Sequence, residues 1–186
     1  MHFEARFSAV GGQGIILAGT IIADAAHLIG MNAAGSPTYT AQVRGGPTKV
    51  DIIVDSERIL YPRTENLDFF LSLATNSYKM FGVGIREKAP VLIDPNMVTV
   101  PDEHRELYNV YEVPIIQLTA EKMSRMVYTS AVCLGTMIAL TDVVTEKAIR
   151  EALVRRAPKG TEEFNLKAFS IGLDYVRDLL SRGVKA

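Results

Sequence analysis

The apolar and polar positions of the first thirty residues predict a strand, a tight turn and a helix. Residues 3–10 form an apolar-rich run that ends abruptly at the glycine-rich turn 11–14. Apolar residues between positions 15 and 29 then recur three or four places apart, the spacing of a helix with one wide buried face. Gly30 follows, a residue favoured just past a helix end. We therefore expect this helix to lie deep against a sheet.

Further apolar runs predict the remaining strands. Several are short and continuous rather than alternating, which is typical of strands buried on both faces of a mainly parallel sheet. A polar, glycine-rich loop is expected over residues 35–47, and a short crossover helix over residues 76–88. The expected strands are residues 31–34, 49–54, 67–73, 90–93 and 115–118.

The C-terminal third of the chain reads as helical. Thr145 and Thr161 stand at N-cap positions, and each is followed by glutamate in the first turn, which suits the helix dipole. Pro158 and Gly160 separate the last two helices. The expected helices are residues 128–140, 146–156 and 162–181.

These elements together predict an α/β fold. No internal repeat, low-complexity tract or linker interrupts the chain of 186 residues. We expect one three-layer, Rossmann-like domain over residues 1–186, with a mainly parallel sheet and a helical C-terminal third.

Composition and charge narrow the class of protein. Hydrophobic residues make up 48% of the chain and charged residues 22%, as in ordinary globular proteins. Twenty basic residues against 21 acidic ones give a formal net charge of -1, which argues against a nucleic-acid binder or a membrane-surface protein. The positive mean hydropathy suggests apolar surface that a partner covers.

Cysteine content limits the redox chemistry of the chain. Cys133 is the single cysteine, and it lies inside an apolar stretch. One thiol cannot form an internal disulfide, a four-cysteine iron–sulfur site or a structural zinc site. We interpret Cys133 as a small buried hydrophobe. The N-terminus lacks the pattern of a signal peptide, and no apolar stretch is long enough to span a bilayer comfortably, so we expect a soluble, cytoplasmic protein.

The glycine-rich turn, Gly11, Gly12, Gln13 and Gly14, allows two interpretations. A dinucleotide fingerprint would need glycine at position 9, where Ala9 stands, and an acidic residue at the end of the second strand, where there is none. The lysine of a P-loop is missing as well. The turn is either a tight connection that packs strand against helix, or an anion or partner contact that presents the Gln13 amide.

A second glycine-rich motif runs from Tyr39 to Pro47 and contains Arg44, Gly45 and Gly46. An arginine beside two glycines can bring a guanidinium and backbone amides to one phosphate or carboxylate. Alternatively, Arg44 pairs with a neighbouring acid and the glycines form the bend into the next strand. We favour a functional role, because glycine-rich loops of this length in compact domains are often functional.

The sequence offers no catalytic residue and no metal site. None of the histidines, His2, His27 and His104, has a nucleophile or metal ligand at a suitable spacing. Asp94 follows a strand in an Asp-Pro-Asn sequence, and the turn interpretation is favoured over a ligand contact. Three further carboxylates, Glu57, Glu65 and Asp68, form no recognisable pair, and residues 150–156 read as a solvated helix face.

Residues 9–18 resemble the opening Gly-x-Gly-Gly-Gln-Gly signature of the gamma subunits of 2-oxoacid:ferredoxin oxidoreductases. The segment from Tyr39 to Gly46 resembles the second signature of that family, a tyrosine followed by Arg-Gly-Gly. The two motifs stand in the expected order on a strand–turn–helix and a loop, and the likeness extends over nearly the whole chain. Ala9 departs from the first glycine of the family pattern.

The resemblance implies a subunit of an oxidoreductase complex rather than an enzyme that works alone. Such complexes oxidatively decarboxylate a 2-oxoacid, attach the acyl group to coenzyme A (CoA) and pass electrons to ferredoxin. Thiamine diphosphate belongs to the alpha and beta subunits and iron–sulfur clusters to a delta subunit or extra domain, so this chain is expected to bind no redox cofactor of its own. The implied partners are the alpha, beta and delta subunits, and ferredoxin through the complex.

The resemblance is greatest to the 2-oxoglutarate type, which forms succinyl-CoA. It makes eight residues candidates for a contact with CoA or with a partner subunit: Gly11, Gly12, Gln13, Gly14, Tyr39, Arg44, Gly45 and Gly46. A free-standing, Rossmann-like protein that binds a nucleotide or acyl-CoA is the alternative.

Overall fold

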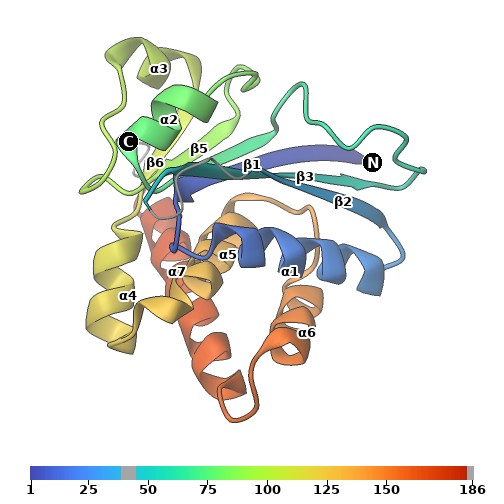
Figure 1. Ribbon diagram of the computed structural model, residues 1–186. Helices are drawn as coiled ribbons and strands as arrows, with labels where there is room; N and C mark the ends of the chain where they lie inside the picture. Colours follow the sequence, from blue (N-terminus) through green and yellow to red (C-terminus); the bar gives the residue numbers. More distant parts are fainter. Residues whose placement is uncertain (39–44, 184–186) are drawn as a thin grey trace.

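The computed structural model describes residues 1–38 and 45–183. A six-stranded sheet forms its middle layer, with the strands in the order β2-β3-β1-β4-β5-β6. Helices cover both faces of this sheet, so the molecule has three layers (Figure 1). The strands are β1 (His2–Val10), β2 (Asn32–Thr38), β3 (Pro47–Asp55), β4 (Phe69–Ser72), β5 (Pro90–Ile93) and β6 (Asn109–Glu112).

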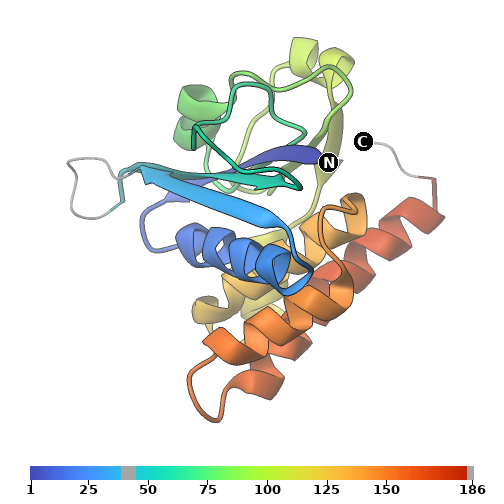
Figure 2. The same cartoon turned by 90° about the vertical axis from the view of Figure 1, so that its right-hand side faces the viewer.

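The two helical layers are unequal. The larger layer holds α1, α4, α5, α6 and α7, and the smaller layer holds α2 and α3 on the opposite face (Figures 1 and 2). A short 3-10 helix, η1 (Met126–Tyr128), leads into α5. The α-helices are α1 (Ile15–Leu28), α2 (Thr75–Phe81), α3 (Asp102–Leu107), α4 (Ile115–Met123), α5 (Thr129–Leu140), α6 (Glu146–Arg156) and α7 (Glu162–Ser181). The predicted three-layer α/β fold is confirmed.

The sheet is parallel except at β3. β1 pairs in parallel with β4, β4 with β5, and β5 with β6, whereas β3 runs antiparallel to both β1 and β2. β2 therefore points the same way as β1 but lies one strand away from it. In a dinucleotide-binding unit the acidic residue of the second strand must reach a ligand at the end of the first. The interposed β3 moves that position outward, which adds to the absence of an acid there.

Alternate residues of the central strands enter two different cores. In β4, Phe69 and Leu71 join the core under the larger helical layer, while Phe70 joins the smaller core with Tyr78 of α2. Successive side chains of a strand point to opposite faces, so a continuous apolar run fits a strand covered on both sides. This explains why the sequence of β4 shows no polar alternation.

β1 shows a different pattern, because its second face is polar. Ala5, Phe7 and Ala9 are buried against the larger helical layer. Arg6 and Asp51 of β3 form a buried ion pair on the opposite face, with Arg6 Nε 2.6 Å from an Asp51 oxygen. Burying charge is tolerated when its hydrogen-bonding capacity is satisfied, and here Arg6 also donates to the backbone carbonyls of residues 81 and 83. Arg6 thus ties the sheet to the segment that follows α2.

Close glycine contacts bring α5 and α7 together. A Cβ atom at Gly135 would lie 2.0 Å from the carbonyl oxygen of Phe169, and one at Gly172 would lie 2.2 Å from that of Val132. Neither distance is sterically possible, so the two helices can approach this closely only because both positions are glycine.

Most predicted helix ends are confirmed. The last two helices have the predicted bounds, and the Thr145 hydroxyl accepts a hydrogen bond from the Ala148 amide as an N-cap should. Thr161 holds the N-cap position, but its hydroxyl donates to the Pro158 carbonyl instead of capping the helix. Gly30 has φ 77° and ends α1 in a Schellman motif, with its amide bonded to the His27 carbonyl.

One predicted element and two predicted boundaries were wrong. Residues 115–118 are the first turn of α4 and not a strand, because Ile115, Thr119 and Met123 bury one helical face. Residues 35–38 belong to β2, since the edge strand extends through Ser36 and Pro37 and pairs with β3. The crossover helix is α2, which ends seven residues before the predicted end at residue 88.

Three elements were missed. The strand β6, the helix α3 and the 3-10 helix η1 were not predicted from the sequence. Within the described ranges, no helix is both long enough and apolar enough to cross a membrane.

Candidate functional site

The glycine-rich turn lies at the point where connections from two neighbouring strands leave the sheet toward opposite faces. The chain leaves β1 through Gly11–Gly14 into α1 on the larger helical layer, while it leaves β4 into α2 on the opposite face (Figure 1). β1 and β4 are parallel neighbours, so their carboxyl ends form a topological switch point. In open α/β sheets ligands bind at such points.

The backbone of the turn is held in one conformation. Gly12 has φ 101° and Gly14 has φ 79°, both in the region that favours glycine. The Gln13 side chain folds back, and its Oε1 accepts a hydrogen bond of 2.9 Å from the Val10 amide. Positive φ angles are what the tight-turn interpretation expected, and the anion or partner contact stays a prediction. The side-chain oxygen of Gln13 is used within the turn and is not presented to a ligand.

The two glycine motifs of the sequence meet in space. The Gly11 amide donates a 3.1 Å hydrogen bond to the carbonyl of Gly46, and a Cβ at Gly11 would lie 3.6 Å from the Gly45 nitrogen. Gly45 has φ 77° and is exposed, whereas Gly46 is buried. Two candidates, Tyr39 and Arg44, lie outside the described residues, so their roles stay predictions. The described parts of both motifs form one surface.

Helices α1 and α5 also converge on this surface. Gly14, the N-cap of α1, faces Ser130 in the first turn of α5, where a Cβ at Gly14 would lie 3.4 Å from the Ser130 Cβ. Both helix N-termini carry the positive ends of their dipoles and amides without helical partners. Ser130 was missed from the sequence, because residues 128–140 read as an uninterrupted core helix; the Thr-Ser pair at the start of that helix was the available signal.

A cavity of about 670 Å³ begins beside the first turn of α1. Its walls are mainly apolar, and Arg125, which is exposed, supplies a cationic group. Such a volume and lining suit a small-molecule or cofactor fragment. The cavity is lined by Leu17, Ile21, Arg125, Met126, Val127, Tyr128, Leu153, Arg156, Ala157, Pro158, Thr161 and Asn165. The sequence did not reveal it, since these residues come from four separate elements.

Asp94 is a structural residue at the end of β5. Its carboxylate is fully buried and accepts hydrogen bonds from the Asn96 amide at 3.0 Å and the Ile116 amide at 2.8 Å. Burial raises the pKa of Asp94, and the two amide bonds act in the opposite direction. The turn interpretation is confirmed: Asp94 joins β5 to the start of α4.

The histidines are likewise engaged or exposed. His104 Nδ1 lies 2.9 Å from the Tyr78 hydroxyl, and His27 is exposed on α1. Burial raises the pKa of Tyr78 to about 12, so this phenol stays protonated at neutral pH.

The buried cysteine has no accessible thiolate. Burial raises the pKa of the Cys133 thiol to about 12, and the residue is completely enclosed by α5 and its neighbours. A neutral, enclosed thiol does not ligate a cluster. Within residues 1–38 and 45–183, no group of three or more histidine, cysteine, aspartate or glutamate side chains is arranged to hold a metal ion.

Comparison with known proteins places the chain in a family. Residues 4–175 match the family model of pyruvate ferredoxin/flavodoxin oxidoreductases. The chain is 32% identical over 180 residues to the 2-oxoglutarate synthase subunit KorC of Methanocaldococcus jannaschii, an alignment that covers 96% of both proteins.

Solved structures agree with this match. The gamma subunit of a keto/oxoacid ferredoxin oxidoreductase from Geobacter sulfurreducens superposes with a TM-score of 0.86 at 31% identity, covering 96% of this chain and 98% of that one. The 2-oxoglutarate:ferredoxin oxidoreductase of Magnetococcus marinus, solved with 2-oxoglutarate, coenzyme A and succinyl-CoA bound, gives 0.84 at 25% identity. That alignment covers 100% of this chain and 32% of the longer Magnetococcus marinus chain. The resemblance found in the sequence is confirmed, and the chain belongs to the pyruvate ferredoxin/flavodoxin oxidoreductase family of oxidoreductase subunits.

Proposed function

We propose that this chain is the gamma subunit of a 2-oxoglutarate:ferredoxin oxidoreductase, which oxidatively decarboxylates 2-oxoglutarate to succinyl-CoA. The observation that carries the proposal is the end-to-end identity with a KorC subunit, 32% over 96% of both chains. Further KorC subunits from Methanothermobacter marburgensis and Methanothermobacter thermautotrophicus match nearly the whole chain. Their shared name favours 2-oxoglutarate over other oxoacids.

The chain acts as one part of a larger assembly. It aligns with only 36% of the ketoisovalerate oxidoreductase subunit VorA of Methanothermobacter marburgensis, so in that relative a domain of this type is joined to further sequence. We therefore propose that the gamma subunit assembles with alpha and beta subunits and with a delta subunit that carries electrons toward ferredoxin.

The geometry of the candidate site fits a supporting role in CoA binding. A diphosphate is bound best by backbone amides at helix N-termini together with a cation, and an extended pantetheine arm needs an apolar channel. The exposed Gly12, the N-termini of α1 and α5, and the cavity that begins at Leu17 with Arg125 in its wall provide both. These groups would hold and orient CoA; no side chain among them supplies a base or nucleophile to the reaction.

Iron–sulfur clusters fit this chain poorly, and the family resemblance implies that thiamine diphosphate belongs to the alpha and beta subunits. A cluster needs several accessible thiolates, and the sole cysteine is enclosed and protonated. We assign both groups to the partner subunits. Thiamine diphosphate would supply the carbanion chemistry of decarboxylation there.

Affinity purification of the tagged chain from its own cells tests the proposed assembly. We expect stoichiometric recovery of alpha and beta subunits, identified by mass spectrometry, together with thiamine diphosphate and iron in the eluate. Recovery of the chain alone, with bound CoA or nucleotide, would instead establish the alternative of a free-standing acyl-CoA-binding protein.

A further inference from the structure

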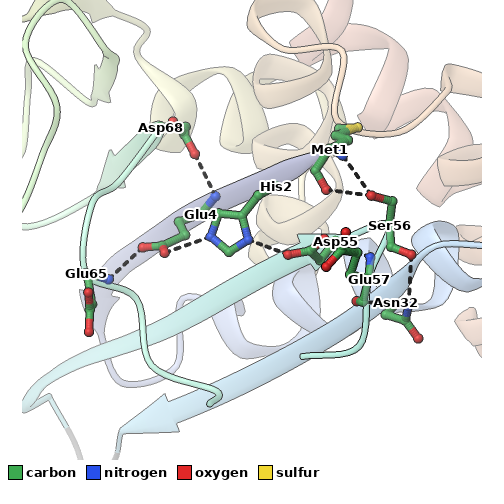
Figure 3. Close-up of polar contacts among 9 residues, drawn as sticks. All are labelled: Met1, His2, Glu4, Asn32, Asp55, Ser56, Glu57, Glu65 and Asp68. Carbon is green, nitrogen blue, oxygen red and sulfur yellow. Dashed lines mark hydrogen bonds and ion pairs between the residues drawn. The ribbon is translucent and has the colours of Figure 1, made fainter. Parts of the chain in front are cut away.

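The connection between β3 and β4, residues 56–66, is held firmly at its first end. The Ser56 amide donates to the Met1 carbonyl at 2.9 Å, and the Glu57 amide donates to an Asp55 carboxylate oxygen at 2.9 Å. The side chain of Asn32 in β2 donates to the Glu57 carbonyl at 3.0 Å (Figure 3). We call residues 56–66 the 56–66 loop.

The second end of this loop is held by the polar face of β1. Glu4 is 6% exposed, and its Oε2 accepts hydrogen bonds from the Glu65 amide at 2.6 Å and the Asn66 amide at 2.8 Å. The buried Arg6 donates to the Thr64 hydroxyl at 2.9 Å. Both anchors belong to the sheet, so this end of the loop is positioned by the core of the protein.

His2 joins the two ends. Its Nδ1 lies 2.5 Å from Asp55 and its Nε2 lies 3.0 Å from Glu4, so one imidazole bridges the carboxylates that hold the two ends of the loop (Figure 3). The base of the 56–66 loop is therefore closed by a continuous polar network. Such closure fixes the geometry of whatever the loop presents outward.

The middle of the loop presents an unusual surface. Residues 58–63 read Arg-Ile-Leu-Tyr-Pro-Arg, and we call them the tip. Leu60 is 84% exposed and Tyr61 is 57% exposed. Among residues 1–38 and 45–183, no hydrogen bond or ion pair joins the tip to the rest of the molecule. Leu60 is the most exposed of the large apolar side chains in that part of the chain.

An apolar, unpaired tip on a firmly anchored base is well suited to binding a partner. Tyrosine and arginine are the residues enriched where binding energy concentrates, and preorganisation lowers the entropy lost on binding. The carboxylates nearest the base, Glu4 and Asp55, are already bonded to His2, while Glu57 and Glu65 lie outside the tip at its anchored ends. Arg58 and Arg63 are exposed and make no ion pair within the described residues, so the tip carries two cations on either side of an apolar centre.

We propose that the tip docks into a partner subunit of the oxidoreductase complex, at an apolar socket flanked by carboxylates. Leu60 and Tyr61 fill the socket, and Arg58 and Arg63 pair with the flanking acids. The inner side of the tip lines a hollow of about 360 Å³ together with Ile53 and the His2 network, and this hollow accepts a side chain of the partner in return. The inference rests on the proposed function, since it needs a partner subunit.

Binding of tip variants to the purified alpha and beta subunits tests the docking. Leu60→Ser with Tyr61→Ala, and Arg58→Glu with Arg63→Glu, should each weaken binding at least about tenfold in titration calorimetry. The arginine variant should also bind with a weaker dependence on salt than the wild type. Thermal unfolding of the isolated chain should not change, because the tip makes no polar contact with the rest of the described chain.

Matched substitutions elsewhere serve as controls. Leu180→Ser removes another exposed leucine, on α7, and Arg155→Glu reverses another exposed arginine, on α6; both should leave binding unchanged. Wild-type affinity in both tip variants would overturn the docking while leaving the proposed function intact. Failure of the wild-type chain to bind any alpha or beta subunit would overturn both. A homodimer that dissociates in the tip variants would assign the tip to a second copy, against the proposal.

Discussion

The amide of Gly11 donates a 3.1 Å hydrogen bond to the carbonyl of Gly46. This bond joins the turn after β1 to the residue that precedes β3, two segments that lie 35 positions apart in the sequence. The glycine-rich turn and Gly46 of the second glycine motif therefore lie on one surface, which we propose as the site. Their conformation depends on glycine at several positions, which makes the site open to direct test.

Gly14→Ala should impair both stability and function. Gly14 has φ 79°, and an L-residue there costs about 1–2 kcal/mol, with added pressure on Ser130 at 3.4 Å. Gly30→Ala is the matched control, since Gly30 has φ 77° but open space around it and lies at the other end of α1. Both variants should lose similar stability in urea unfolding. Only Gly14→Ala should raise the KM for CoA of the assembled complex. An equal rise in this KM with Gly30→Ala would show that the turn has no specific role in CoA binding.

Gly135→Ala should be among the most destabilising single substitutions in the chain. The new Cβ would meet the Phe169 carbonyl at 2.0 Å, so α5 and α7 must separate, at a cost of about 3 kcal/mol or more. Gly35→Ala in β2 meets nothing within 4 Å and should change the free energy of unfolding little. Chemical denaturation of both variants measures the difference. A stable Gly135→Ala protein would show that the helix contact is wrongly placed.

Arg6→Met should destabilise the protein strongly because it leaves Asp51 buried without its main partner. Loss of one member of a buried ion pair costs about 3–5 kcal/mol, and Lys49, which also contacts Asp51, compensates for part of it. Arg6→Met combined with Asp51→Leu should recover stability relative to the single variant. A double-mutant cycle in urea gives the coupling between the two residues. Additive effects would mean that the pair does not interact.

His2 should make stability depend on pH near neutrality. Hydrogen bonds to Asp55 and then to Glu4 raise the pKa of His2 above its ordinary 6.5. Protonation is favoured in the folded state, so this stabilisation is fully present below about pH 6.5 and is lost as pH rises through the folded pKa. Unfolding from pH 5.5 to 9 should show the difference between wild type and His2→Gln shrinking as pH rises. A constant difference would exclude the proton-linked bridge.

Sequence patterns predicted helix bounds correctly where local features alone determine where the helix begins and ends. The bounds of α6 and α7 follow from helical spacing, the Thr145 cap of α6 and the breaks at Pro158 and Gly160. The start of α4 was predicted as a strand because a short apolar run fits a buried strand and a buried helical turn equally well. The choice is made by tertiary contacts, chiefly the Asp94 carboxylate that accepts the Ile116 amide.

Edge strands, and contacts between residues far apart in the sequence, were not predicted for a related reason. β6 has a single buried residue, Val110, so its sequence carries little apolar signal, and β2 extends through Ser36 and Pro37, which are typical loop residues. Proline is tolerated there because β2 is an edge strand. The partnership of Gly14 with Ser130 joins residues more than a hundred positions apart. No local pattern encodes such a contact, although the motif residues themselves were recognisable.

Reconstituted activity tests the central claim most directly. Ferredoxin reduction is followed with 2-oxoglutarate and CoA, using this chain alone, the other subunits alone, and all subunits together. The account predicts no activity from the isolated chain and CoA-dependent activity, with succinyl-CoA formed, only in the complete mixture. Ferredoxin reduction by the chain alone, or full activity of the other subunits without it, would contradict the account.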